Sequence, residues 1–291
     1  MYSVKKLYLP QTLEEALAIL AEHPEAWPLA GGTDVLVKMR HKAMKDVVLL
    51  SLAKLPLSGV EDHGDEIVIL PGTTFTALAN DPVIIARLPM LRTAALSMGG
   101  PQIQNVATIG GNVCNGATSA DSAPSLFALG AELVLSSVRG ERRIPIAEFY
   151  AGPGRVKREA DELLTAIHIP VGKQENWGGA YIKFSTRKAM DISILGSAAV
   201  CELNADGTVK HAAIALGVAG PTPVRCTEAE ELLIGKVPTE ELLLEAGRLS
   251  LTPCSPRSSW RATKEYREAL IQELSVRAFR EAYHLAGGNN V

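Results

Sequence analysis

The chain has 291 residues, which is enough for about two domains with a sizeable core in each. Its formal net charge of −3 argues against a nucleic-acid surface or an anionic membrane as the main partner. No apolar run reaches the roughly 18 residues of a membrane span, and the first residues show no export signal, so we expect a cytoplasmic protein with no membrane contact.

The cysteines and histidines show no metal-binding pattern. Cys114, Cys201, Cys226 and Cys254 lie far apart without a C-x-x-C motif, and the histidines form no H-E-x-x-H or i, i+4 pair. This spacing excludes an obvious zinc or iron–sulfur site in the chain and fits a reducing compartment.

The first elements predict a small α/β unit that ends near Pro56. Thr12 is expected to cap a helix, and Glu15 to complete a capping box, before His23-Pro24 ends the helix. A glycine-containing turn follows at Leu29–Asp34, and residues 46–52 read as a buried strand.

A second α/β unit is predicted from residue 57 to residue 175. Strands are expected at 66–70 and 132–137, and β-like segments at 144–149 and 162–169. Helices are expected at 74–81, 91–98 and 122–129. In the segment 162–169, alternation places Leu163, Thr165 and Ile167 on one face and Leu164, Ala166 and His168 on the other. Residues 103–109 lead into a long loop, and residues 172–179 read as a polar linker.

The pattern changes after residue 179. Three apolar strands are predicted at 180–185, 192–203 and 209–218, with a hairpin at Asn204–Gly207. Helices are predicted at 228–234, 239–249 and 259–285. A three-stranded sheet backed by helices therefore forms a second, α+β domain from 176 to 291.

Two segments rich in glycine stand out. The first glycine segment is Leu29–Asp34 (LAGGTD), and the second is Ala107–Pro124 (ATIGGNVCNGATSADSAP). Glycines such as Gly31 and Gly110 can take positive φ and let backbone N–H groups converge on an anion. In the second segment, Thr108, Asn112, Asn115, Thr118 and Ser119 supply neutral donors, and Asp121 begins a helix.

The pair is more informative than either segment. A single Gly-Gly beside Thr is a turn in most soluble proteins, but two copies that both follow predicted strands indicate a pyrophosphate and hence a dinucleotide. Neither segment is G-x-G-x-x-G, so a Rossmann site is not indicated.

The order and spacing of LAGGTDVL, TIGGNVCNGATSADSAP, DELLTAIHIP and YIKFSTRKAMDIS resemble the FAD-binding subunit of the xanthine dehydrogenase family of molybdenum hydroxylases. GVAGPTPVRC and SSWRATKEYR extend the resemblance to the C-terminal domain. The family layout, shared with the medium subunit of carbon monoxide dehydrogenase, implies a p-cresol methylhydroxylase-type FAD domain. That domain has two α/β subdomains, at about 1–56 and 57–175, and an α+β domain follows it.

The resemblance also implies site residues. The first segment would contact the FAD phosphates through Trp27, Pro28, Leu29, Ala30, Gly31, Gly32, Thr33, Asp34, Val35 and Leu36, and the second through Thr108, Ile109, Gly110, Gly111, Asn112 and Thr118. Asp121 matches an acidic residue at the end of that segment, Leu164 an apolar residue against the flavin, and Lys183 a basic residue near the isoalloxazine ring. Without the resemblance, Asp121 reads as a helix cap, Leu164 as core and Lys183 as a snorkelling strand residue.

The implied activity is electron transfer. Non-covalent FAD would take electrons from [2Fe-2S] clusters in one partner chain and pass them to NAD or another acceptor, while a third chain holds the molybdenum cofactor and oxidises xanthine or hypoxanthine. The loop Arg187–Asp191 borders the nicotinamide side in the family. It keeps only Asp191 of the several acidic residues that NAD-using relatives can carry, which leaves the acceptor open. Two alternatives remain. The chain could be the flavin subunit of a related complex that oxidises carbon monoxide or another N-heterocycle, or it could be an assembly subunit that binds no FAD.

Overall fold

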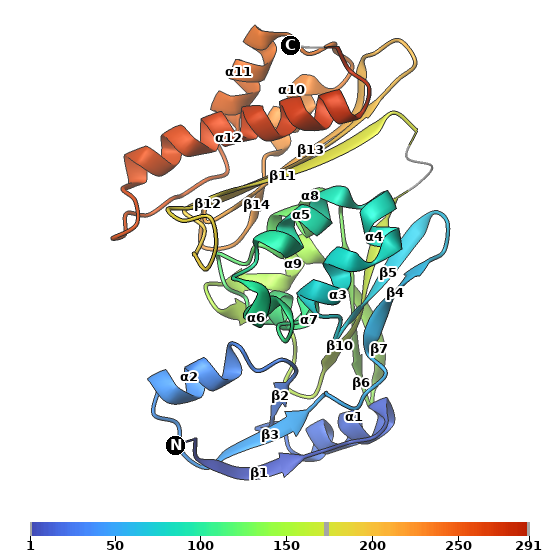
Figure 1. Ribbon diagram of the computed structural model, residues 1–291, viewed down its shortest axis with the longest axis vertical. Helices are drawn as coiled ribbons and strands as arrows, with labels where there is room; N and C mark the ends of the chain where they lie inside the picture. Colours follow the sequence, from blue (N-terminus) through green and yellow to red (C-terminus); the bar gives the residue numbers. More distant parts are fainter. Residues whose placement is uncertain (1, 172–174, 290–291) are drawn as a thin grey trace.

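The structure is a computed structural model that describes residues 2–171 and 175–289. An N-terminal unit, a middle unit and a C-terminal domain follow one another along the long axis of the molecule (Figure 1). The fold is α+β, as predicted. None of the helices in the described part is long and apolar enough to cross a lipid bilayer.

The N-terminal unit is a three-stranded parallel sheet in the order β1-β3-β2. Thr12 caps the first helix as predicted, because its Oγ1 accepts a hydrogen bond from the Glu15 amide at 3.2 Å. The Glu15 carboxylate in turn accepts from the Gln11 amide at 2.7 Å, one residue before the cap. The unit contains β1 (Val4–Tyr8), α1 (Leu13–Glu22), β2 (Trp27–Leu29), α2 (Val35–His41) and β3 (Val47–Ser51).

The middle unit is built on a five-stranded antiparallel sheet in the order β4-β5-β10-β6-β7. Phe75 and Leu126 from its helices pack with Ile67 and Leu133 from the sheet, and all four are fully buried. Its strands are β4 (Ser58–Asp62), β5 (Glu66–Pro71), β6 (Glu132–Ser137), β7 (Gly140–Pro145), β8 (Tyr150–Gly152), β9 (Arg155–Val156) and β10 (Leu163–Pro170). Its helices are α3 (Phe75–Asn80), α4 (Pro82–Arg87), α5 (Pro89–Ser97), α6 (Pro101–Gln104), α7 (Ile109–Cys114), α8 (Ser122–Ala128) and α9 (Ile146–Phe149).

Two predictions for this unit were wrong in detail. The segment 144–149 is not one β-like element, because β7 ends at Pro145 and α9 follows. Ile146 and Phe149 are both buried, and their spacing of three residues suits one face of a helix. Alternation along β10 is also broken: a register shift between Leu164 and Ala166 lets Leu164 and Ile167 join the same core, while Leu163 packs toward the N-terminal unit.

The C-terminal domain is a four-stranded antiparallel sheet in the order β11-β12-β13-β14. The fourth strand was not predicted, because it is only two residues long. The hairpin at Asn204–Gly207 is confirmed, with the Gly207 amide donating to the Asn204 carbonyl at 3.0 Å. The domain contains β11 (Trp177–Phe184), β12 (Leu195–Leu203), β13 (Val209–Gly217), β14 (Val224–Arg225), α10 (Thr227–Leu233), α11 (Glu240–Leu249) and α12 (Lys264–Leu285).

This sheet is buried on both faces. Along β12, Ala198 and Val200 belong to the core of the middle unit, whereas Ala199 and Cys201 pack with the helices of the C-terminal domain. The predicted boundary at residues 175 and 176 falls between β10 and β11. Of the predicted linker, residues 172–174 lie outside the described residues, and 177–179 belong to β11.

Candidate cofactor-binding site

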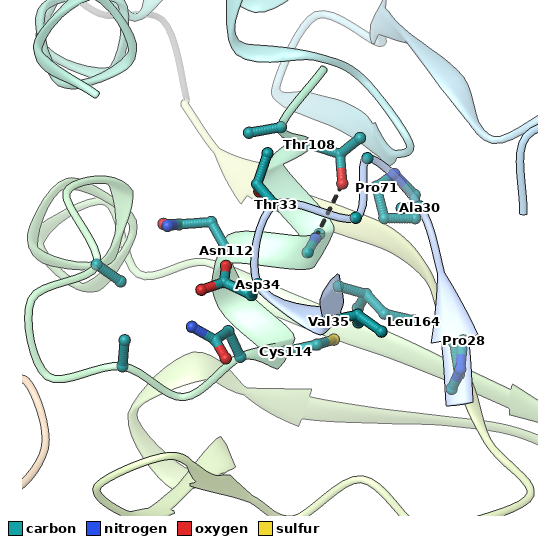
Figure 2. A pocket seen from close by; sticks show the side chains of 18 of the residues that line it. Pro28, Ala30, Thr33, Asp34, Val35, Pro71, Thr108, Asn112, Cys114 and Leu164 are labelled. Atoms are coloured by element: carbon teal, nitrogen blue, oxygen red, sulfur yellow. Dashed lines mark hydrogen bonds between the residues drawn. The ribbon is translucent and has the colours of Figure 1, made fainter. Parts of the chain in front are cut away.

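A cavity of about 660 Å³ opens between the N-terminal and middle units, and its far end reaches the C-terminal domain. Both glycine segments line it, which Figure 2 shows for Ala30, Thr33 and Thr108. Of the predicted site residues, those that line the cavity are Trp27, Pro28, Ala30, Gly31, Gly32, Thr33, Asp34, Val35, Thr108, Gly110, Gly111, Asn112, Asp121 and Leu164.

The first glycine segment is a tight turn between β2 and α2. Gly32 has a φ of +77°, which favours glycine. A Cβ on Gly31 would lie 1.7 Å from the carbonyl oxygen of Val106 and 3.1 Å from the Cα of Ala107, so the first segment packs closely against the start of the second. Within residues 2–171 and 175–289, the amides of Gly31, Gly32 and Thr33 donate to no protein acceptor. The turn therefore presents unpaired donors beside the cavity.

The second glycine segment contains the short helix α7 in place of part of the predicted long loop, and α8 begins after Asp121 as predicted. Thr108 caps α7, because its Oγ1 accepts from the Gly111 amide at 3.1 Å. A Cβ on Gly110 would lie 2.3 Å from the Cβ of Pro71, so Gly110 is required for packing and not for positive φ. A Cβ on Gly111 would meet only the Thr108 hydroxyl within 4 Å. Gly111 thus leaves open space on the cavity side of α7.

Two oppositely charged residues, Asp34 and Lys38, line the cavity beside the first segment. Burial raises the pKa of Asp34 above its ordinary value, and the Lys38 charge and a hydrogen bond with Asn115 act in the opposite direction. Lys38 Nζ also donates to Asn115 Oδ1, which joins α2 to the end of α7. Sequence reasoning missed Lys38 as a lining residue, although its i, i+4 spacing from Asp34 was a usable signal.

A polar cluster closes the cavity at the C-terminal domain. The Asp121 carboxylate accepts from Lys183 Nζ at 2.8 Å, from Ser193 Oγ at 2.7 Å and from Tyr181 Oη at 3.2 Å. Lys183 Nζ also donates to the Ser97 carbonyl at 2.9 Å. Burial raises the pKa of Asp121, and the Lys183 charge is the main opposing effect. The helix-cap interpretation of Asp121 is wrong, since its side chain caps nothing.

Five predicted residues do not line the cavity. Leu29 and Leu36 pack in a small apolar cluster around Met39, and Ile109 is fully buried in the core of the middle unit. The Thr118 carbonyl accepts from the Val218 amide at 3.0 Å. Lys183 lines a neighbouring pocket of about 350 Å³ beside the loop Arg187–Asp191. Leu164, in contrast, does line the cavity. It also belongs to the core of the middle unit and is 5% exposed.

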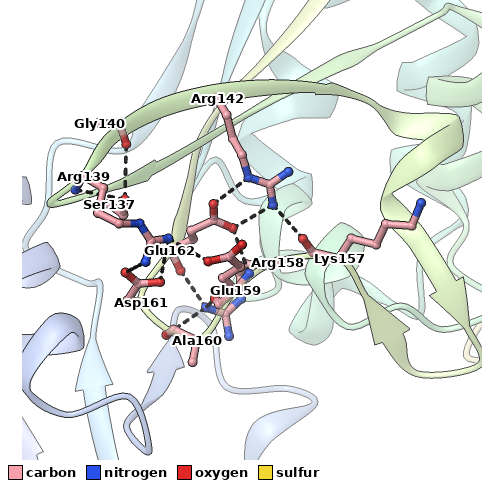
Figure 3. Close-up of polar contacts among 10 residues, drawn as sticks. All are labelled: Ser137, Arg139, Gly140, Arg142, Lys157, Arg158, Glu159, Ala160, Asp161 and Glu162. Carbon is pink, nitrogen blue, oxygen red and sulfur yellow. Dashed lines mark hydrogen bonds and ion pairs between the residues drawn. The ribbon is translucent and has the colours of Figure 1, made fainter.

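Several lining residues were not predicted, because they come from distant segments. Arg158 lies at one edge, where its Nη1 donates to the carbonyls of Glu159 at 2.8 Å and Glu162 at 2.6 Å (Figure 3). At the other end, the Met190 amide donates to the Gly99 carbonyl at 2.8 Å. The further unpredicted residues include Pro71, Gly72, Phe75, Met98, Gly99, Ile103, Ala160, Leu163 and Ile192. The cavity is also lined by Cys114, Asn115, Ala117, Ser119 and Ala120 of the second segment and by Met190 and Asp191 of the loop Arg187–Asp191.

Comparisons with known proteins agree with this architecture. Residues 2–172 match the family described as FAD binding domain in molybdopterin dehydrogenase, and residues 180–282 match the CO dehydrogenase flavoprotein C-terminal domain. The chain is 42% identical over 291 residues to the xanthine dehydrogenase FAD-binding subunit of Escherichia coli O157:H7, with 99% of each chain covered. It is 31% identical over 278 residues to the carbon monoxide dehydrogenase medium chain of Hydrogenophaga pseudoflava, covering 95% and 96% of the two chains.

A solved structure shares the fold along nearly the whole length. It is the carbon monoxide dehydrogenase from Hydrogenophaga pseudoflava that lacks the Mo-pyranopterin moiety of the molybdenum cofactor. The TM-score is 0.93 at 30% sequence identity, with 98% of this chain and 99% of that chain covered. The chain therefore belongs to the family of FAD-binding subunits of molybdenum hydroxylases that includes the xanthine dehydrogenase and carbon monoxide dehydrogenase flavoproteins.

Proposed function

We propose that this chain binds FAD non-covalently in the cavity between its N-terminal and middle units. It then carries electrons from iron–sulfur centres in a partner chain to NAD or another acceptor. The observation that supports this most directly is that both glycine segments line one cavity and that Gly31 packs against the start of the second segment.

The cavity fits a dinucleotide. Its volume of about 660 Å³ lies within the range of roughly 300–1,000 Å³ that is typical of ligand sites. Unpaired amides of the first segment lie beside it, and the surface at Gly111 is open where a side chain would fill it. Amides that converge without an intervening side chain suit a pyrophosphate. The predicted site residues that line the cavity are our candidates for these contacts.

The chain's own residues bind and orient the cofactor, which supplies the redox chemistry when bound. Gly31, Gly32 and Thr33 would donate their amides to the phosphates. Leu164 contributes an apolar wall. At the far end, Lys183 is held by Asp121 and the Ser97 carbonyl, so its ammonium group has a fixed position. No acid–base or nucleophilic residue is required.

The proposal extends to the substrate of the whole complex and to its partner chains. The E. coli relative is a xanthine dehydrogenase subunit, which favours xanthine or hypoxanthine as the substrate of the complex. The molybdenum cofactor and the iron–sulfur clusters would lie in partner chains, and the complex would be cytoplasmic. Carbon monoxide and nicotinate remain rival substrates, because relatives with about 31% and 32% identity act in those dehydrogenases.

Purification of the chain with its partners tests the proposal. We expect the visible absorbance of an oxidised flavin that is released by denaturation. A colourless protein that also fails to take up added FAD would instead support an assembly role. Turnover of the intact complex with xanthine, carbon monoxide and nicotinate then shows which of these compounds is its substrate.

A further inference from the structure

Two cysteines that lie far apart in the sequence meet in the C-terminal domain. The Cys226 thiol donates to the Ser250 carbonyl at 3.6 Å, and the Cys254 thiol donates to the same oxygen at 3.1 Å. The two thiols are also hydrogen-bonded to one another, and this contact, followed by burial, raises the pKa of Cys226. The fold thus brings together two cysteines whose spacing along the chain suggests no relationship.

Hydrogen bonding alone does not explain why sulfur occupies both positions. Ser250 lies at the C-terminal end of α11, where carbonyls have no intrahelical partner and need a donor from elsewhere. A thiol is a weak donor, so a hydroxyl group at either position would serve this carbonyl better. What distinguishes two thiols from two hydroxyls is that they can form a covalent bond with one another.

The two cysteines differ in exposure and in how the backbone holds them. Cys226 is 1% exposed, and its amide donates to the Ile214 carbonyl of β13 at 2.9 Å. Cys254 is partly exposed and lies in the connection between α11 and α12, outside any helix or strand. A small oxidant therefore reaches Cys254 first. The connection that carries Cys254 can also supply the movement that brings two sulfurs to the roughly 2 Å of a disulfide.

We propose that Cys226 and Cys254 are a peroxide-sensitive dithiol that closes to a disulfide. In the first step the Cys254 sulfur attacks one oxygen of hydrogen peroxide, the O–O bond breaks, and a sulfenic acid and water form. In the second step the Cys226 sulfur attacks the sulfenic sulfur, the S–O bond breaks, and the hydroxyl group leaves as water with the Cys226 proton. One peroxide is reduced to two waters while the two thiols are oxidised.

The disulfide locks the helices of the C-terminal domain together. Cys226 immediately precedes α10, and Cys254 follows α11, so the bond joins the start of one helix to the connection beyond the next. A covalent link removes conformations of the unfolded chain and so favours the folded domain. Exchange with a small thiol reverses the bond. The inference is independent of FAD binding, because neither cysteine is among the described residues that line the cavity.

Peptide mapping of the full chain, assembled with its partners, tests the link. The complex is treated with excess hydrogen peroxide, the remaining thiols are alkylated under denaturing conditions, and the digest is compared with and without dithiothreitol. We expect a pair of peptides joined through Cys226 and Cys254 that dithiothreitol separates. Free thiols at both positions, a sulfinic or sulfonic acid at Cys254, or a bond from either residue to another cysteine would each overturn the proposal.

Thermal unfolding tests the lock with matched variants. We expect peroxide to raise the melting temperature of the wild type by about 5 °C or more, and dithiothreitol to reverse the rise. C226A and C254A should each abolish it. C201A, which removes a different buried thiol from the same core, is the control and should keep it. A rise that persists in C254A, or no rise in wild type that carries the linked peptides, would overturn the proposal.

Discussion

The Asp121 carboxylate and the Lys183 ammonium lie 2.8 Å apart, where the start of α8 meets β11. Their side chains are only 6% and 10% exposed, so each charge depends on the other for compensation. The pair links the middle unit to the C-terminal domain, with Asp121 lining the cavity and Lys183 lining the neighbouring pocket. If FAD binds as proposed, the positive charge of Lys183 near the cavity is largely balanced by Asp121.

We predict that Asp121→Asn raises the reduction potential of the bound flavin. The substitution removes the negative charge and leaves the Lys183 cation uncompensated beside the cavity, which favours the electron-rich form of the cofactor. For a two-electron couple, roughly 30 mV corresponds to about 1.4 kcal/mol, so a rise of that order is measurable by spectroelectrochemistry. Ser193→Ala, which removes a hydrogen bond but no charge, serves as the control. An unchanged or lower potential in Asp121→Asn would contradict the prediction.

We predict that Gly111→Val abolishes FAD retention and leaves the fold intact. A Cβ at this position would meet only the Thr108 hydroxyl within 4 Å, and Gly111 lines the cavity, so the methyl groups of valine should occupy the space of the cofactor. Gly31→Ala offers a contrast, because its Cβ would collide with the Val106 backbone and should destabilise the chain itself. The measurements are flavin occupancy of the purified protein and thermal unfolding with and without added FAD. Wild-type occupancy in Gly111→Val would exclude the proposed close approach.

We predict that Glu162→Gln destabilises the protein at neutral pH and much less in acid. The Glu162 carboxylate is 3% exposed and accepts from Arg142 Nε at 2.6 Å, from Arg142 Nη2 at 2.9 Å and from the Glu159 amide at 2.8 Å (Figure 3). Burial raises its pKa, but these hydrogen bonds and the charges of Arg142 and Arg139 outweigh burial and hold the pKa below the ordinary value of 4.5. The folded state thus favours the ionised form.

The sign of the pH dependence follows from that lowered pKa. The stabilisation by Glu162 is fully present above pH 4.5 and is lost as the pH falls through the lower folded-state pKa. The variant should lose about 1–3 kcal/mol of unfolding free energy at pH 7, and the difference from wild type should shrink below pH 4.5. Denaturant unfolding at several pH values measures it. Glu159→Gln, which affects an exposed ion pair, should change little at any pH. A constant difference across the range would refute the assignment.

Short-range signals carried most of what the sequence revealed. Thr12 and the turn Asn204–Gly207 are confirmed, because caps and tight turns depend on a few neighbouring residues. The two glycine segments were recognised for the same reason. That they line one cavity was an expectation from the pairing of motifs, and the structure places both there.

The sequence by itself therefore determined the helix cap at Thr12, the hairpin at Asn204–Gly207 and the two glycine segments that line the cavity. Only the tertiary structure decided that residues 109–114 of the second segment form a helix, that a bulge turns Leu164 inward with Ile167, and that Lys183 pairs with Asp121 across 62 residues. The physical reason is that caps and turns are local, whereas the partner of a buried charge is set by how sheets and helices pack. No spacing along the chain encodes that packing directly.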